Sequence, residues 1–336
     1  MSFIKKIACS IIVVLYCLVF FSCNNSQEDI TNDGIILGFS QIGAESAWRN
    51  QNTRSVQEAA ARQRIQLLFF NAEQKQENQI RAIRSFIAYQ VDVIAFVPII
   101  SGGWRNVLEE ARDAGIPVLI CDREINDQYN DLYTGYLGTN MLQQGRSAAE
   151  FLVIKFFDPP EGFAASHSIG QPIKIVELQG TEDSSPAILR ALGFREVLAD
   201  HAEFQIIYSA SGDFLRSKGY ELMCDILDDP LLRNMDVLFS HNDSMTLGAI
   251  DAMKERNIQP GKDIIIVSID AEQAAIDALK RGEINCVVEC NPNQGPDIIN
   301  LALRLARGEA IPRMSYMIEA VFNEWDDLSR LAPRGY

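Results

Sequence analysis

The chain has 336 residues, of which 47% are hydrophobic, and its formal net charge is −15. This length allows two domains or one large domain, and the hydrophobic content is ordinary for a globular protein. No block of basic residues occurs anywhere in the chain. This argues against nucleic acid as a partner, because phosphate binding draws on clustered Lys and Arg.

The N-terminus has the pattern of an export signal. Lys5 and Lys6 precede Ile7–Phe21, an apolar stretch of 15 residues. This stretch is short for a transmembrane helix, which needs roughly 20 apolar residues, and its length fits a secretory signal peptide. We therefore expect residues 1–22 to be a signal peptide.

Cys23 directly follows this apolar stretch and Ser22. A cysteine in this position resembles the lipidated residue of bacterial lipoproteins, although Phe20 stands where those proteins usually carry Leu. We therefore expect Cys23 to anchor the exported chain to a membrane through a lipid, in the periplasm or at the cell surface, with residues 23–33 as a polar tether. Soluble secretion and an uncleaved anchor are the alternatives.

From Asp33 onward, short apolar runs alternate with amphipathic stretches, which is typical of βαβ units and a parallel sheet. The first series of predicted strands comprises Ile35–Phe39, Ile65–Phe70, Val91–Val97 and Pro117–Cys121, with helices at about 46–63, 75–89 and 103–114. A helix near 140–156 leads to a second series, with strands Ile173–Leu178, Phe204–Tyr208, Val237–Ser240 and Ile264–Ile269 and helices at about 185–200, 214–227 and 243–256.

Three segments follow both series: the strand-like Ile284–Glu289, a helix at about 294–307 and the strand-like Met314–Phe322. We expect them to complete the two units by crossing back between them. The pattern therefore predicts an α/β fold of two doubly wound parallel-sheet lobes. Because ligands of such sheets bind beyond the carboxyl ends of the strands, two facing sheets would place all strand-end loops around one cleft.

Beyond Cys23, the exported chain contains Cys121, Cys224, Cys286 and Cys290. Their spacing does not resemble a disulfide framework. Cys286 and Cys290 are four residues apart in what reads as one strand, so they would share a face about 13 Å apart and could not pair. We expect all four to be buried free thiols.

Polar and aromatic residues follow the strands of the first series. Asp122 and Arg123 come directly after a buried strand, where an accepting carboxylate and a donating guanidinium can bracket two neighbouring hydroxyls. The alternative is a solvated surface pair. Near the start of the first predicted helix, Trp48 is interpreted as a platform for a sugar ring or as packing against the next helix. Arg49, beside it, is interpreted as a hydroxyl donor or a surface residue.

The second series has similar residues after its strands. Phe214 follows Asp213, a predicted helix N-cap, and is interpreted as an aromatic wall of the cleft or as a core residue. Asn242 offers a donor and an acceptor to the cleft, and Asp243 beside it is the predicted N-cap of the next helix.

Two further charged residues are candidates for the same cleft. Asp270 follows the strand Ile264–Ile269 and is expected to accept hydrogen bonds from sugar hydroxyls. Arg190 lies early in the helix at 185–200 and either reaches inward or lies on the surface.

Motifs for other chemistries are absent from the sequence. It contains no glycine-rich nucleotide-binding motif, no serine nucleophile elbow and no His-Glu-x-x-His zinc motif. We expect no cofactor and no metal. Asp122 and Asp270 facing each other would also suit glycoside hydrolysis. However, Arg123 beside Asp122 suits binding better than acid catalysis.

Seven segments, taken in order, resemble the type I periplasmic sugar-binding proteins of ABC importers. They are Gly38–Gly43, Gln74–Ile80, Asp122–Arg123, Val176–Thr181, Gly212–Gly219, His241–Asp243 and Pro260–Ile264. The resemblance spans about residues 34–322. It is closest to the galactofuranose-binding members of the family and more distant to the ribose-binding members.

This resemblance implies the type I periplasmic binding protein fold, in which three hinge segments join the lobes. We place the N-terminal lobe at 34–137 plus 292–318 and the C-terminal lobe at 138–291 plus 319–336. Eight residues then fall on family positions that contact the sugar, the first five more surely than the rest: Asp122, Arg123, Phe214, Asn242, Asp270, Trp48, Arg49 and Arg190.

Two segments depart from the family pattern. Glu182–Pro186 replaces a glycine-containing loop, and Glu289–Asn291 only loosely matches a polar hinge contact. Because one changed contact can shift preference by about 1–3 kcal/mol, these departures leave the identity and ring form of the sugar open.

The resemblance implies a monomeric binding protein, not an enzyme, that encloses a monosaccharide and delivers it to the membrane permease of an ABC transporter. The sugar would be galactofuranose-like or a related pentose or hexose. A sugar-sensing role for a chemoreceptor or a sensor kinase is the alternative. A repressor core of the same fold would carry a DNA-binding headpiece where this chain has an export signal, and a sugar-active enzyme would show turnover.

Overall fold

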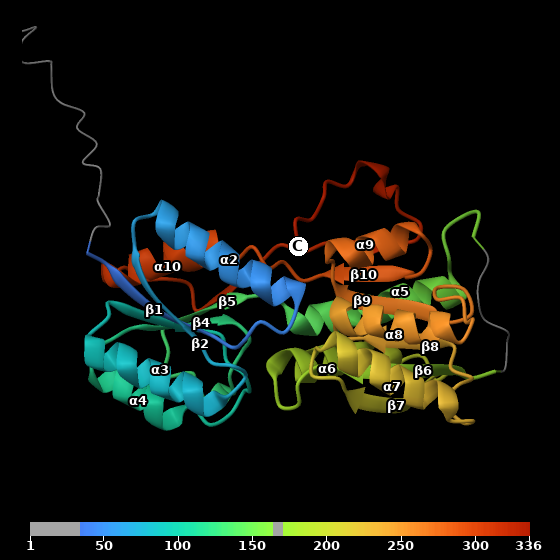
Figure 1. Ribbon diagram of the computed structural model, residues 1–336, viewed down its shortest axis with the longest axis horizontal. Helices are drawn as coiled ribbons and strands as arrows, with labels where there is room; N and C mark the ends of the chain where they lie inside the picture. Colours follow the sequence, from blue (N-terminus) through green and yellow to red (C-terminus); the bar gives the residue numbers. More distant parts are fainter. Residues whose placement is uncertain (1–33, 164–170) are drawn as a thin grey trace, which may run out of the picture. The chain divides into compact units, whose positions relative to one another are not determined.

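The structure, a computed structural model, describes residues 34–163 and 171–336 (Figure 1). The predicted signal peptide at 1–22, the predicted lipidation site Cys23 and the predicted tether at 23–33 lie outside the described residues. Within the two described ranges, no helix is both long enough and apolar enough to cross a bilayer.

The first of two six-stranded sheets is parallel throughout and has the strand order β11-β5-β4-β3-β1-β2. Its strands are β1 (Ile36–Gln41), β2 (Gln66–Asn71), β3 (Val93–Phe96), β4 (Val118–Asp122), β5 (Gly135–Gly138) and β11 (Met314–Tyr316). All four residues of β3 are buried, as expected for a central parallel strand that is covered on both faces.

Helices cover both faces of this first sheet (Figure 1). They are α2 (Ala47–Arg62) and α10 (Gly295–Ala306) on one face and α3 (Gln76–Tyr89) and α4 (Arg105–Asp113) on the other. Successive side chains of β3 alternate between the two cores: Val93 and Ala95 pack with α2 and α10, whereas Ile94 and Phe96 pack with α3 and α4. We call this sheet with its helices the N-terminal lobe.

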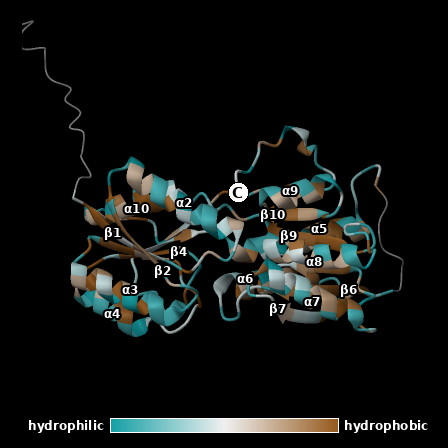
Figure 2. Ribbon diagram, in the orientation of Figure 1, coloured by the Kyte–Doolittle hydropathy of each residue, from teal (hydrophilic) through white to brown (hydrophobic). Residues whose placement is uncertain are grey.

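The second sheet has the order β12-β10-β9-β8-β6-β7, and its edge strand β12 is antiparallel to β10. Its strands are β6 (Ile173–Gln179), β7 (Phe204–Ser211), β8 (Val237–Ser240), β9 (Ile265–Asp270), β10 (Cys286–Glu289) and β12 (Val321–Asn323). The helices are α5 (Met141–Phe157) and α6 (Ser185–Leu198) on one face and α7 (Arg216–Asp228), α8 (Asp243–Glu255) and α9 (Gln273–Lys280) on the other. We call this sheet with its helices the C-terminal lobe. Figure 2 shows hydrophobic residues concentrated along the strands of both sheets.

Within the described residues, the chain passes between the two sheets three times. β5 leads through 139–140 into α5, β10 leads through 290–294 into α10, and β11 leads through 317–320 into β12. The predicted fold class, two parallel-sheet α/β lobes, is therefore confirmed. The exact lobe boundaries stay a prediction.

Three elements differ from the sequence prediction. The pattern does not predict β5, whose apolar part is only Tyr136 and Leu137 between two glycines, nor the two-turn helix α9. The segment Met314–Phe322, predicted to be one strand-like unit, contains two strands of three residues each that join different sheets. Short strands of this kind are specified by their neighbours more than by their own sequence.

Candidate ligand-binding site

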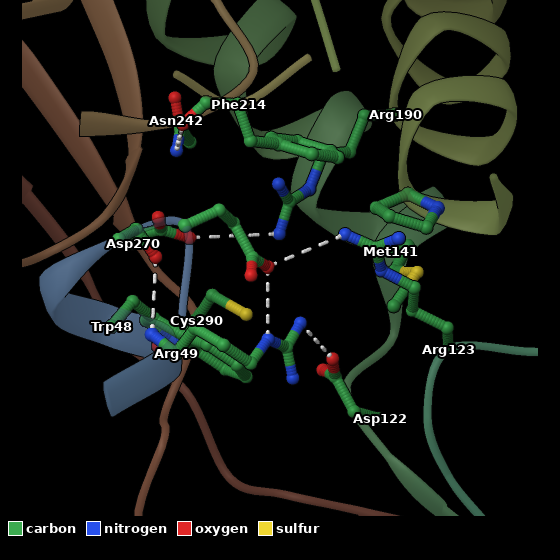
Figure 3. A pocket seen from close by; sticks show the side chains of 13 residues that line it. Trp48, Arg49, Asp122, Arg123, Met141, Arg190, Phe214, Asn242, Asp270 and Cys290 are labelled. Carbon is green, nitrogen blue, oxygen red and sulfur yellow. Dashed lines mark hydrogen bonds and ion pairs between the residues drawn. The ribbon is translucent and has the colours of Figure 1, made fainter. Parts of the chain in front are cut away.

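A cavity lies at the carboxyl ends of strands from both lobes (Figure 3). The space between its side chains, part of which is open to solvent, is about 340 Å³. All eight predicted ligand contacts line it: Trp48, Arg49, Asp122, Arg123, Arg190, Phe214, Asn242 and Asp270. The lining also includes five residues that the sequence did not indicate: Glu45, Ser46, Met141, Pro186 and Cys290.

Asp122 ends β4 in an unusual backbone conformation. Its φ is 59°, and the N–H of Arg123 donates to the carbonyl of Cys121 at 2.6 Å, which closes a three-residue γ-turn. The hydroxyl of Tyr136 donates to the carbonyl of Asp122 at 2.6 Å and supports the turn. Positive φ is uncommon outside glycine, and Asp is one of the residues that tolerate it best. Backbone outliers of this kind cluster at functional sites.

Arg49 lies in the first turn of α2, whose N-cap Ser46 accepts a hydrogen bond from the Arg49 N–H at 3.1 Å. Its buried guanidinium donates to Oδ2 of Asp122 at 2.7 Å and to Oε1 of Glu45 at 3.1 Å. Burial alone would lower the pKa of Arg49, but the two carboxylates outweigh burial and raise it. The surface interpretation of Arg49 is therefore wrong.

Trp48 contributes to the wall of the cavity from the N-terminal lobe and packs within a core of the C-terminal lobe. Its indole Nε1 donates to the carbonyl of Cys290, and its backbone N–H donates to Oε1 of Glu272 at 3.0 Å. The guanidinium of Arg49 stacks at 4.6 Å from the centre of the ring. The packing interpretation of Trp48 therefore holds in part, because the ring is buried in a core, although its neighbours there belong to the C-terminal lobe. The role of a sugar platform stays a prediction.

Arg123 is buried as well, so the surface-pair interpretation of Asp122 and Arg123 is wrong. Its guanidinium lies 5.1 Å from the ring centre of Phe214, and Nη1 donates to the carbonyl of Ile99 at 3.0 Å. Burial, together with repulsion from Arg49, lowers the pKa of Arg123 to about 10, so the group remains cationic at neutral pH. Phe214 lines the cavity and also belongs to a core of the C-terminal lobe, so both of its interpretations hold in part.

Asp270 ends β9 with a φ of 132°, which is the second backbone outlier at a strand end that lines the cavity. The nearest guanidinium is that of Arg190, whose Nη2 lies 3.8 Å from Oδ1 of Asp270. Burial raises the pKa of Asp270 well above its ordinary value, although Arg190 acts in the opposite direction. Arg190 is itself buried and donates to Oε1 of Gln144 at 2.9 Å and to the carbonyl of His241 at 2.5 Å. The surface interpretation of Arg190 is therefore wrong.

Asn242 combines a capping role with its position on the cavity. It, and not Asp243, is the N-cap of α8, because its Oδ1 accepts from the N–H of Met245 at 3.0 Å. Its Nδ2 donates to the carbonyl of Phe214 at 3.2 Å. The predicted cap Asp243 is instead the first residue of the helix and is buried, where burial raises the pKa of its carboxyl group well above the ordinary value.

Two smaller predictions also need correction. Asp213 does not cap α7; Leu215 holds that position, and Asp213 forms an ion pair with Lys218. All four cysteines within the described residues are free, but Cys224 is only half-buried, and Cys290 lies one residue beyond β10. The expectation of complete burial is therefore wrong for Cys224.

The cavity is rich in charged hydrogen-bonding groups. Three guanidinium groups, from Arg49, Arg123 and Arg190, point into the same space (Figure 3). Carboxyl groups of Asp122 and Asp270 enter it from different lobes. Such groups bind a ligand with several hydroxyls through charge-assisted hydrogen bonds. In the part of the chain that the structure describes, no group of three or more His, Cys, Asp or Glu side chains is arranged to hold a metal ion.

The chain matches one protein family along most of its length. The sequence profile described as "periplasmic binding protein domain" matches residues 37–310. The chain belongs to the periplasmic binding protein family. It is a binding protein rather than an enzyme, so the interpretation of Asp122 and Asp270 as a hydrolytic pair is wrong.

Three relatives within this family are similar to the chain. The galactofuranose-binding protein YtfQ of Escherichia coli (strain K12) is 40% identical over 78% of this chain and 79% of its own. A Mycobacterium smegmatis protein solved in complex with β-D-fucofuranose is 39% identical, with a TM-score of 0.82 over 88% of this chain and 94% of that one. The periplasmic component of the arabinose ABC transporter of Shewanella sp. ANA-3, solved with α- and β-L-arabinofuranose, is 36% identical, with a TM-score of 0.79 over 86% and 92%.

Proposed function

We propose that this protein captures a monosaccharide in its furanose form, such as galactofuranose or a related pentose or hexose, in the cavity between its lobes. The observation that carries the proposal is that buried arginines and aspartates from both lobes line one cavity at the carboxyl ends of the strands. Relatives at 36–40% identity are named for, or solved with, galactofuranose, β-D-fucofuranose and L-arabinofuranose, which supports the same ligand class here.

Each lobe contributes four of the eight predicted contacts. Trp48, Arg49, Asp122 and Arg123 come from the N-terminal lobe, and Arg190, Phe214, Asn242 and Asp270 come from the C-terminal lobe. A sugar that contacts both sets binds the closed arrangement better than an open one and shifts the population towards closure. The aromatic residues exclude water and the polar residues set specificity.

Direct hydrogen bonds between the lobes accompany this arrangement. The N–H of Ser101 donates to the carbonyl of Asp183 at 2.9 Å, and the N–H of Glu124 donates to the hydroxyl of Ser185 at 2.8 Å. Both acceptors belong to Glu182–Pro186, the segment that departs from the family pattern. This segment therefore contributes to closure by its backbone and by a serine side chain.

The closed, loaded protein then delivers its sugar to the membrane permease of an ABC transporter. We infer from the expected export signal and from Cys23 that a lipid anchor holds the protein outside the cytoplasm, where a permease would be within reach of a tethered monomer. Replacing Cys23 with Ala is expected to release the protein into the soluble fraction and to abolish labelling with radioactive palmitate. An anchored and labelled C23A protein would contradict the anchoring proposal.

The binding proposal is tested by titration calorimetry of the purified protein with D-galactose, D-fucose and L-arabinose. We expect saturable one-to-one binding of at least one of them and a higher melting temperature. Ligand at about 100 times its Kd stabilises a protein by about 2.7 kcal/mol, which is easily measured. Heat and melting temperature unchanged by every sugar in the panel would reject the proposal.

A further inference from the structure

Glu45 is a charged cavity residue to which the predicted set of contacts gives no role. It lies in the loop between β1 and α2, and its side chain is 5% exposed. Its Oε1 accepts from Nε of Arg49 at 3.1 Å and lies 3.9 Å from Nη2 of Arg123. Its Oε2 is buried and has no hydrogen-bond partner. A buried carboxylate oxygen without a partner is unfavourable, so its position on a cavity indicates that a ligand completes it.

Arg123 has a complementary hydrogen-bond donor without an acceptor. Its Nη1 is satisfied by the carbonyl of Ile99, but its buried Nε has no acceptor. Glu45 thus carries one unsatisfied acceptor and Arg123 one unsatisfied donor, and both residues line the cavity. A hydroxyl group both donates and accepts, so a polyhydroxy ligand can satisfy both atoms, whereas a ligand carboxylate can only accept.

The pairing of carboxylates with arginines around the cavity indicates that Glu45 determines whether a neutral or an acidic ligand binds. Asp122 forms an ion pair with Arg49 at 2.7 Å, and Asp270 is the carboxylate nearest to Arg190. Among the ion pairs of the described residues, the carboxylate that lies within 4 Å of the Arg123 guanidinium is that of Glu45. Without the charge of Glu45, Arg123 would be a buried cation ready to receive an anionic ligand.

We propose that Glu45 is a specificity-determining residue that accepts a hydroxyl of a neutral sugar and repels the carboxylate of an acidic sugar such as a uronate. This inference rests on the proposed function and narrows its ligand class. Placing a second carboxylate beside a buried one is strongly unfavourable, because bringing like charges together in a desolvated interface costs several kcal/mol. Selectivity here uses repulsion of the wrong ligand as well as attraction of the right one.

The test compares D-galactose with D-galacturonate, which differ at one carbon, in titration calorimetry at neutral pH. Wild type is expected to prefer galactose by at least about 100-fold. Glu45→Gln keeps the shape but removes the charge, so we expect about tenfold weaker galactose binding and a preference reduced below about tenfold. The matched control Glu58→Gln removes an exposed charge on α2, where the side chain is 56% exposed, and should preserve both values.

Glu45→Asp tests the negative charge separately from the length of the side chain. It retains the negative charge but withdraws it from Arg123, so it should weaken galactose binding and still reject galacturonate. A preference in Glu45→Gln equal to that of wild type, or loss of preference in Glu45→Asp with its charge intact, would overturn the inference while leaving sugar binding established. A wild-type protein that binds no neutral sugar of the panel would instead overturn the proposed function, and this inference with it.

Discussion

Each lobe places one aspartate at the cavity at the end of a strand, but the contacts that hold the two aspartates differ. In each lobe, a buried parallel strand ends in an aspartate with positive φ, Asp122 in β4 and Asp270 in β9. Asp122 is held by its own lobe through the ion pair with Arg49 at 2.7 Å and the hydroxyl of Tyr136 on its carbonyl. The carboxyl group of Asp270 has a longer ion pair with Arg190, at 3.8 Å, and its carbonyl accepts from the N–H of Cys290 at 3.2 Å and from the hydroxyl of Tyr336 at 3.4 Å.

Support for the second aspartate extends to a crossing between the lobes. Arg190 donates to Gln144, and Gln144 donates to the carboxyl group of Glu319 at 2.8 Å in the crossing 317–320. One aspartate is therefore fixed before ligand arrives, whereas the surroundings of the other depend on the segment that must bend when the lobes move. The N-terminal lobe provides a rigid half-site, and the C-terminal lobe provides a half-site coupled to the hinge.

The largest expected effect follows from removing the rigid half-site. Asp122→Ala should lower sugar affinity by about 100-fold or more, because it deletes a ligand acceptor and leaves Arg49 as a buried guanidinium with one carboxylate fewer. Calorimetry with the sugar that wild type binds measures this loss. The exposed Asp113→Ala, whose side chain is 72% exposed in the wild type, serves as control. Near-wild-type affinity in a folded D122A protein would remove Asp122 from the site.

The second prediction concerns the hinge support and uses pH. Burial raises the pKa of Glu319 to about 7, with Glu289 adding to the rise and Gln144, the Asn291 N–H and Arg190 opposing it. The folded state therefore holds this proton more tightly than the unfolded chain. Protonated Glu319 therefore stabilises the fold at low pH, and this stabilisation is lost as pH rises from about 4.5 through about 7. The free energy of unfolding should change by about 3 kcal/mol over this range.

Glu319→Gln should remove this contribution, so its unfolding free energy, measured in urea between pH 4.5 and 8, should fall less with pH than that of wild type. The exposed Glu309→Gln, with a side chain 47% exposed in the wild type, should follow the wild-type profile. Other buried acids such as Asp270 act in the same direction, so only the difference between variant and wild type is informative. Parallel profiles for wild type and E319Q would show that Glu319 titrates normally.

The third prediction tests whether the position of Arg190 depends on the close packing of α5 against α6. Gly145 of α5 lies so close to α6 that an added Cβ would be 2.1 Å from the carbonyl oxygen of Arg190. Alanine favours helices by up to about 1 kcal/mol over glycine, but this clash forces α6 to shift and should outweigh that gain, destabilising by about 1–3 kcal/mol. Urea unfolding and calorimetry of Gly145→Ala should show lower stability and weaker sugar binding.

The control for Gly145→Ala is Gly102→Ala, where an added Cβ meets only the side chain of Asn126 at 3.7 Å. That variant should bind sugar as wild type does. If Gly145→Ala is destabilised but binds with unchanged affinity, Arg190 tolerates displacement, and the C-terminal half-site is less dependent on its helix than the structure indicates.

The sequence predicted what local patterns determine. Asp122 and Asp270 were identifiable because each follows a run of apolar residues, and the carboxyl ends of parallel strands form the ligand edge of such sheets. Glu45, Gln144 and Glu319 were not, because their importance arises from neighbours more than 40 residues away in the chain, such as Arg123 for Glu45, Arg190 for Gln144 and Arg190 for Glu319. No spacing rule connects these residues.

Helix caps show the same limit at short range. Asn242 and Asp243 are both good N-cap residues, and local sequence does not choose between them. The choice is made by tertiary contacts: Asp243 accepts from the N–H of Glu272 at 2.7 Å, which fixes its side chain inside the core and leaves the cap to Asn242. The cavity position of Asn242 follows from that choice.

The smallest expected effect distinguishes the two aspartates directly. Burial raises the pKa of Asp270, so a neutral side chain is readily accommodated there, whereas Asp122 must balance the guanidinium of Arg49. Asn has almost the shape of Asp and also tolerates positive φ. Asp270→Asn should therefore weaken sugar binding by no more than about threefold at neutral pH, while Asp122→Asn weakens it by about tenfold or more, since hydrogen bonds to charged groups are the stronger kind. Calorimetry of both variants with the same sugar makes the comparison. Equal losses would mean that ligand binding ionises both aspartates, and that the rigid and the hinge-coupled half-sites become equivalent once the sugar is bound.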